Sequence, residues 1–364
     1  MGSQPAGTGL GGLPRLRPAR ALLAVVVALA LVAGVVGLIG HIADFARLRD
    51  ALERMDPAWL IPAIAGKVGA YAGYILAYSE MAAMRGGPIL GGWTATRIVG
   101  IGFGAFVAGS AAGGLAMDWW ALQRAGCTGH DALRRVLGLN TLQWAALGAG
   151  AALAGLAALA GLVSEVPSAM AIAWVVTVPV CVAGGLWASA PGRIERLSQV
   201  PAPVSPDGSG PYVLRWGWRG LRALLADAIG GLVYVRAALR HPLRHRTAIV
   251  GYPLYWAGDL LTLYACVRAF GVHLGLVSLV LAYATGYAAT ALPLPVGGAG
   301  GVDAAMTLAL TAVGLSLAPA LLIAVTYRGV SFWLPILPAL ALLPTAPRLA
   351  RDLSEIALRE EAGR

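Results

Sequence analysis

The sequence contains few charged residues and no long polar stretch. Only 12% of its 364 residues are charged, whereas soluble domains carry about 25%. This scarcity of charge, combined with 58% hydrophobic residues, excludes an ordinary soluble protein and indicates a polytopic membrane protein. No polar segment is long enough to form a separate soluble catalytic domain.

Residues that bind metals or nucleotides are also scarce. The three cysteines, Cys127, Cys181 and Cys266, are scattered through apolar sequence and are expected to be inert core thiols. No HExxH, Cys–His or GxxxxGK[ST] spacing occurs. We therefore expect no cofactor, no metal site and no enzyme activity.

Acidic residues are outnumbered by basic ones, 17 to 27, which gives a net charge of +10. In a membrane protein such an excess reports cytoplasmic loops and anionic lipid, and not nucleic acid. Membrane lipids are therefore the expected partners, no nucleic-acid partner is expected, and a homo-oligomer remains possible.

Long apolar runs are abundant. Six of them can cross a hydrocarbon core of about 30 Å. The first follows three arginines but is too long for the apolar part of a signal peptide, so we expect it to be retained. The six predicted spans are Ala21–Gly40, Trp59–Met84, Leu133–Val163, Ala169–Ala190, Ala248–Phe270 and Pro319–Leu343.

Two further apolar regions are interrupted. Trp93–Gly126 contains GSAAGG at Gly109–Gly114, and Leu276–Gly314 contains LPLPVGGAGGVD at Leu292–Asp303. Proline removes a backbone donor and glycine loosens a helix. The arm after each break extends only roughly 20 Å as a helix, too short to span. We predict two re-entrant hairpins, since broken backbone survives in a bilayer only where protein or water satisfies it.

The distribution of arginine predicts the topology. The arginine-rich segment 192–246 and the N-terminal tail 1–20 are placed in the cytoplasm by the positive-inside rule, and the C-terminal tail 345–364 follows. The layout is span, span, hairpin, span, and then the same order inverted, as in many secondary transporters. The predicted fold is an all-α polytopic membrane protein with about six spans, two opposed re-entrant hairpins and an inverted repeat. It forms one transmembrane domain, 21–344, whose halves are about 21–163 and 169–344.

The second interrupted region carries a family resemblance. The run LPLPVGGAGGVDAAMTLALTAVGLS, followed by TYRGVSFWLP, resembles the transmembrane domain of bacterial lysylphosphatidylglycerol synthases, a flippase-like domain that also occurs alone. The sequence holds no soluble aminoacyl-transferring domain, so we expect no synthesis of lysyl-lipid. The resemblance implies a stand-alone protein that moves a lipid or lipid-linked molecule. It places these residues in the motif: Pro293, Pro295, Gly297, Gly298, Gly300, Asp303 and Arg328.

Charges within apolar segments are the candidate site residues, because each costs on the order of 3 kcal/mol at the bilayer centre without a partner or a water cavity. Asp303 and Asp118, beside the two breaks, could cap helices or bind substrate. Arg328 could bind a phosphate or pair with Asp303 or Asp259. Lys67 and Asp259 could pair with each other, or titrate and contact lipid. Gly301, at the start of the last arm, could present a helix N-terminus to a phosphate.

Translocation of a phospholipid or lipid-linked anionic molecule across the bacterial inner membrane is the leading functional hypothesis. The protein would lie in that membrane with both termini in the cytoplasm. Two alternatives remain open: a non-transporting membrane partner of a lipid-modifying enzyme, and a membrane enzyme acting on a lipid-linked substrate.

Overall fold

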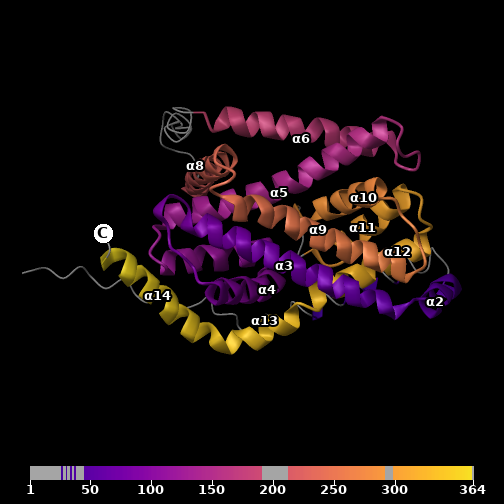
Figure 1. Ribbon diagram of the computed structural model, residues 1–364, viewed down its shortest axis with the longest axis horizontal. Helices are drawn as coiled ribbons and strands as arrows, with labels where there is room; N and C mark the ends of the chain where they lie inside the picture. The colour runs from indigo at the N-terminus through magenta and orange to yellow at the C-terminus, as the bar shows by residue number, and fades with distance from the viewer. Residues whose placement is uncertain are drawn as a thin grey trace, which may run out of the picture.

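The fold is a bundle of helices (Figure 1). The computed structural model describes residues 45–190, 212–291 and 298–362. It also describes six single residues nearer the N-terminus, all helical, at positions 26, 27, 30, 33, 34 and 37. All regular secondary structure in this part of the chain is helical. Its main helices are α2 (Phe45–Glu53), α3 (Leu60–Ala83), α4 (Gly92–Arg124), α5 (Gly129–Leu159), α6 (Ser168–Ala188), α8 (Tyr212–Arg240), α9 (Arg246–Ala269), α10 (Leu276–Ala288), α11 (Gly301–Ala312), α12 (Leu317–Arg328), α13 (Ile336–Leu342) and α14 (Ala346–Ala362).

Helices α3 and α9 lie side by side along the middle of the molecule (Figure 1). Gly66 and Gly73 of α3 face Gly258 and Gly251 of α9, and the two helices run antiparallel. A Cβ atom on Gly73 would lie 2.4 Å from the Gly251 carbonyl oxygen, and one on Gly258 would lie 2.4 Å from that of Gly66. The two backbones therefore touch directly, as small residues permit between membrane helices. We call this contact the glycine seam.

Four helical segments are long and apolar enough to cross a membrane. They coincide with four of the six predicted spans, so a multi-pass membrane protein is confirmed. The fourth segment is bent. A π-helical turn (Gly329–Trp333) follows α12, and prolines lie at the N-cap and within the first turn of α13. The segments are Pro57–Gly86, Gly129–Leu159, Ser168–Ala188 and Leu317–Ala362.

The two remaining predicted spans have different outcomes. Ala248–Phe270 corresponds to α9, which is a continuous helix but is not among the four long apolar segments. The sequence of α9 is more polar than those of the four segments. Some of its polar side chains, including Asp259, are buried against other helices, where they do not face lipid. Most of Ala21–Gly40 lies outside the described residues.

Helix α4 folds back on itself near its middle. Residues 105 and 113 of a straight helix would be about 12 Å apart along its axis. Instead, a Cβ atom on Gly113 would lie 2.0 Å from the carbonyl oxygen of Ala105, and Gly102 faces Met117. The two arms are therefore antiparallel neighbours, although helical backbone continues between them.

Helices α10 and α11 form a second antiparallel pair. A Cβ atom on Gly286 of α10 would lie 2.7 Å from the Cα of Met306 of α11. Gly298 and Gly300 precede α11 with φ angles of 79° and 78°, in the left-handed region that favours glycine. The predicted interruption of the helix is therefore present, with α11 beginning at Gly301. Pro293, Pro295 and Gly297 lie outside the described residues.

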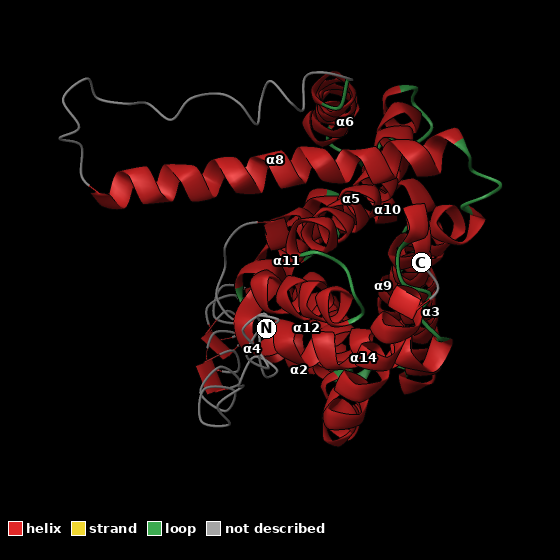
Figure 2. Cartoon of the chain, turned by 90° about the vertical axis from the view of Figure 1, so that its left-hand side faces the viewer, coloured by secondary structure: helices red, strands yellow, loops and turns green. Residues whose placement is uncertain are grey.

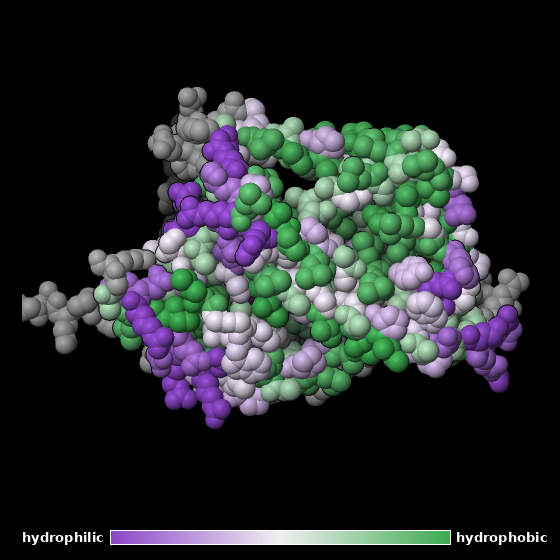
Figure 3. Space-filling model, in the orientation of Figure 1, coloured by the Kyte–Doolittle hydropathy of each residue, from purple (hydrophilic) through white to green (hydrophobic). Residues whose placement is uncertain are grey.

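Apolar side chains form a band across the face shown in Figure 3, while hydrophilic side chains gather at its two ends, around α14 and α2. Large hydrophobic residues exposed on α3, α5 and α6 include Val68, Leu153 and Val180. A soluble protein rarely exposes so continuous an apolar surface, so this band is suited to lipid. Figure 2 shows α8 lying across α5. The two helices approach closely at Gly231 and Gly138, because a Cβ atom on Gly231 would lie 2.8 Å from the backbone nitrogen of Gly138.

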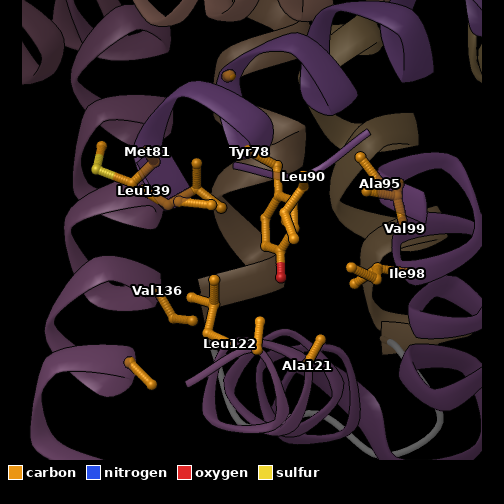
Figure 4. Close-up of a cluster of buried hydrophobic side chains, with 14 of the residues drawn as sticks. Tyr78, Met81, Leu90, Ala95, Ile98, Val99, Ala121, Leu122, Val136 and Leu139 are labelled. Atoms are coloured by element: carbon orange, nitrogen blue, oxygen red, sulfur yellow. The ribbon is translucent and has the colours of Figure 1, made fainter. Parts of the chain in front are cut away.

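The C-terminal segment packs against the helices instead of extending as a free tail. Leu349 and Leu353 of α14 are fully buried, and Asp352 pairs with Arg97 of α4. A buried cluster joins α3, α4 and α5 nearby. Figure 4 shows Tyr78 pointing toward Ala121 and Leu122 within it. This end of the bundle is held by side-chain packing, whereas the glycine seam is a contact of backbones.

Candidate functional site

A cavity of about 370 Å³ lies beside the glycine seam. Helices α3, α4, α5, α9 and α12 contribute to its walls, together with the end of α10 and the π-helical turn. We call it the central cavity. Its lining includes four charged residues that the sequence singles out: Lys67, Asp118, Asp259 and Arg328.

Lys67 and Asp259 form a buried ion pair across the seam. The Nζ of Lys67 lies 2.7 Å from Oδ1 of Asp259, and Asp259 is wholly buried. The hydroxyls of Tyr283 and Tyr327 donate to the other carboxylate oxygen. The ammonium also lies 5.3 Å from the ring centroid of Tyr71. The predicted pairing of these two charges is confirmed, and both groups have the partners that burial requires.

Asp118 is a buried carboxylate of a different kind. It lies on the second arm of α4, 5% exposed, and its Oδ2 accepts a hydrogen bond of 3.1 Å from the hydroxyl of Tyr74. It makes no ion pair with any other residue the structure describes. It caps no helix start, because α4 begins at Gly92. It lies on the wall of the central cavity.

Asp303 and Arg328 form a second ion pair behind the cavity. Oδ2 of Asp303 accepts a 2.8 Å hydrogen bond from the backbone N–H of Gly300, so the predicted capping of α11 is confirmed. Its Oδ1 lies 3.4 Å from Nε of Arg328, and the guanidinium carbon lies 4.3 Å from the ring centroid of Phe332. Arg328 lines the cavity, whereas Asp303 does not. Asp303 thus caps α11 with one carboxylate oxygen and lies within ion-pair distance of Arg328 with the other.

The glycines of the second break lie around this ion pair. Gly300 is the N-cap of α11, Gly301 is its first residue, and Gly298 precedes them. None of the three lines the central cavity. They form the backbone that leads into the first turn of α11, which carries Asp303.

Sequence reasoning missed the aromatic and amide lining of the central cavity. Tyr71 and Tyr74 share one face of α3 with Lys67, since helical residues three and four apart are neighbours. This spacing is visible in the sequence and was the available signal. Across the cavity, Tyr287 and Trp144 have ring centroids 5.7 Å apart. The other missed polar and aromatic residues are Asn140, Gln143, Tyr255, Thr290, Tyr327, Ser331, Phe103, Phe106 and Phe332.

A polar cavity inside an apolar bundle can hold a hydrated or charged headgroup away from hydrocarbon. Comparison with protein-family models identifies a match to the lysylphosphatidylglycerol synthase TM region over residues 25–339. The chain belongs to this family. No curated protein matches the chain.

The family match covers most of the chain, and no synthase domain was found in it. All residues that line the central cavity fall within the matched region. The lysylphosphatidylglycerol synthase TM region therefore includes the site, whereas α14 follows it.

Proposed function

We propose that this member of the lysylphosphatidylglycerol synthase TM family translocates a phospholipid or lipid-linked anionic molecule across the bacterial inner membrane. The central cavity carries the proposal, because it gathers Lys67, Asp118, Asp259 and Arg328 inside a bundle whose exterior is apolar. Charges at membrane depth are costly and mark substrate pathways.

The folded α4 and the α10–α11 pair act as two re-entrant hairpins in this proposal. The turns that end their second arms have the same hydrogen bonds. After α4, the N–H groups of Gly126 and Cys127 donate to Gln123 and Leu122, and after α11 those of Gly314 and Leu315 donate to Thr311 and Leu310. Gly126 and Gly314 also share a φ of 101°.

An inverted repeat is supported by the glycine seam as well. Gly66 and Gly73 are spaced as Gly251 and Gly258 are, and each touches the other pair reciprocally. This correspondence makes Tyr74 the counterpart of Asp259. The polar site is thus asymmetric even though the backbone repeats: Asp259 pairs with Lys67, whereas its counterpart Tyr74 donates a hydrogen bond to Asp118.

The cavity would replace water around a crossing headgroup while the acyl chains stay in lipid. Arg328 is placed to bind a phosphate, since a guanidinium matches phosphate oxygens. Asp303 would orient this arginine from behind. Asp118, with tyrosine and amide groups near it, would contact the remainder of the headgroup.

Transfer of fluorescent phospholipid between leaflets of proteoliposomes tests the proposal. We expect Arg328→Ala to slow transfer by about tenfold or more, since it removes a charge-assisted hydrogen bond. Arg97→Ala is the matched control: Arg97 is also buried and paired with an aspartate, but it lies outside the cavity. Both variants are first compared with wild type by thermal unfolding. Equal transfer by wild type and a folded Arg328→Ala would remove the arginine from the mechanism, and no transfer by wild type would overturn the proposed function.

A further inference from the structure

A second, larger cavity of about 760 Å³ lies at the end of the molecule where α3 and α4 end and α5 begins. It shares no lining residue with the central cavity. Its walls come from the turns after α3 and α4, the start of α5, the second half of α8 and the last turns of α14. We call it the Arg85 pocket, after the residue on the turn that follows α3.

The turn that carries Arg85 is held in place by a buried arginine. Arg135 is 3% exposed, and its Nη1 donates to three carbonyl oxygens at the end of α3: those of Met81 (3.1 Å), Ala82 (2.8 Å) and Met84 (2.6 Å). Its Nε donates to Asp131 at 2.8 Å. Arg135 thereby provides hydrogen-bond donors to carbonyl groups that the end of a helix leaves without partners. Buried hydrogen bonds therefore fix the conformation of this turn.

Arg85 itself has a strained backbone. Its φ and ψ are 54° and 39°, and it is the only non-glycine residue with positive φ in the part of the chain that the structure describes. This conformation costs an L-residue roughly 1–2 kcal/mol, and strain of this kind is concentrated at functional sites. A glycine or asparagine would adopt this conformation at lower cost, so the local backbone does not explain an arginine at this position.

Arg85 lies on the wall of this pocket. Its guanidinium carbon lies 6.0 Å from the ring centroid of Tyr234 on α8, and it makes no ion pair with another described residue. Arg134, half exposed, lines the same pocket, with its Nε 2.9 Å from Asp227. Glu360 and Glu361 of α14 also line it.

We propose that the Arg85 pocket binds a phosphate ester, with Arg85 and Arg134 on the phosphate and the α14 glutamates accepting hydrogen bonds from hydroxyl or ammonium groups beside it. Guanidinium groups suit phosphate because their planar N–H fork matches its oxygens. The volume lies in the range of small-molecule sites. The ester is either the headgroup of a lipid or a soluble compound. This inference is independent of translocation.

Binding to the purified full-length chain tests the proposal in two arms. One arm titrates glycerol phosphate and follows thermal unfolding; the other adds phosphatidylglycerol in detergent and counts bound lipid by native mass spectrometry. Arg85→Asn removes the charge while asparagine tolerates the left-handed backbone, so folding should be retained. Arg351→Gln removes an exposed α14 arginine outside the pocket and is the control.

We expect wild type and Arg351→Gln to bind alike and Arg85→Asn to bind about tenfold more weakly or worse. Loss in the glycerol phosphate arm supports a soluble ester, and loss in the phosphatidylglycerol arm supports a lipid headgroup. Equal affinities for wild type and Arg85→Asn in both arms, or no binding by wild type in either, would overturn the proposal. Neither result depends on whether lipid is flipped.

Discussion

Three buried acids, two on the wall of the central cavity and one behind it, differ in the partners that their carboxylates have. Asp259 has Lys67, and Asp303 has Arg328. Asp118 has a tyrosine hydroxyl as its side-chain partner. Since an ionised carboxylate is costly to bury without a cation, Asp118 is the acid most in need of a partner from outside the protein, either a proton or a cationic group.

The effects of substituting Lys67 and Asp259 on the free energy of unfolding should depend strongly on each other. Lys67→Met leaves a buried carboxylate without its cation, and we expect a loss of about 3–5 kcal/mol, seen as a lower unfolding temperature in detergent. Asp259→Asn with Lys67→Met should lose less than the sum of the single changes. Additive losses would contradict the pairing.

Cys127, in the turn after α4, should react slowly with thiol reagents. Its partial burial raises the pKa of the thiol to about 11, so less thiolate is present at neutral pH than for an ordinary cysteine. In the Cys181→Ser, Cys266→Ser background, the rate of N-ethylmaleimide labelling should keep rising with pH up to about 11. A rate that levels off near pH 9 would show an ordinary thiol.

At the scale of elements, the glycine seam makes a sharp prediction. Gly73→Ala places a methyl group 2.4 Å from a backbone oxygen of α9, and we expect a loss of more than about 3 kcal/mol because backbone cannot move aside as a side chain does. Gly69→Ala, on the same helix with nothing within 4 Å, is the control and should be neutral or slightly stabilising. The measurement is thermal unfolding of the two variants, and similar unfolding temperatures would refute the seam.

The elements differ in how far sequence could predict them. The interruption before Gly301 was predictable because proline and glycine act locally on the backbone. The pairing of Lys67 with Asp259 was predictable because isolated charges of opposite sign in apolar helices need partners. The contact between Tyr74 and Asp118 was not, since tyrosines are compatible with many surroundings and the fold-back of α4 determines the contact. The packing of α14 on α4 was likewise set by tertiary structure.

At the scale of the whole molecule, the arginine distribution predicts that α2 lies outside the cell and α14 inside. Leu52 on α2 and Leu358 on α14 are both exposed and suited to cysteine labelling. In a background without native cysteines, Leu52→Cys should react with a membrane-impermeant maleimide on intact cells, and Leu358→Cys only after permeabilisation. The reverse pattern would invert the topology.

The backbone contact between α3 and α9 also limits how the molecule can move. Helices that touch at four glycines cannot rotate or slide past each other without backbone collision, whereas no such reciprocal glycine contact joins the described residues of the two folded-back regions to that pair. A transport cycle would therefore keep the distance between these two helices constant and change the distances from them to α4 and α11. Distances between pairs of spin labels on these helices, measured with and without lipid substrate, would show which distances stay constant and which change.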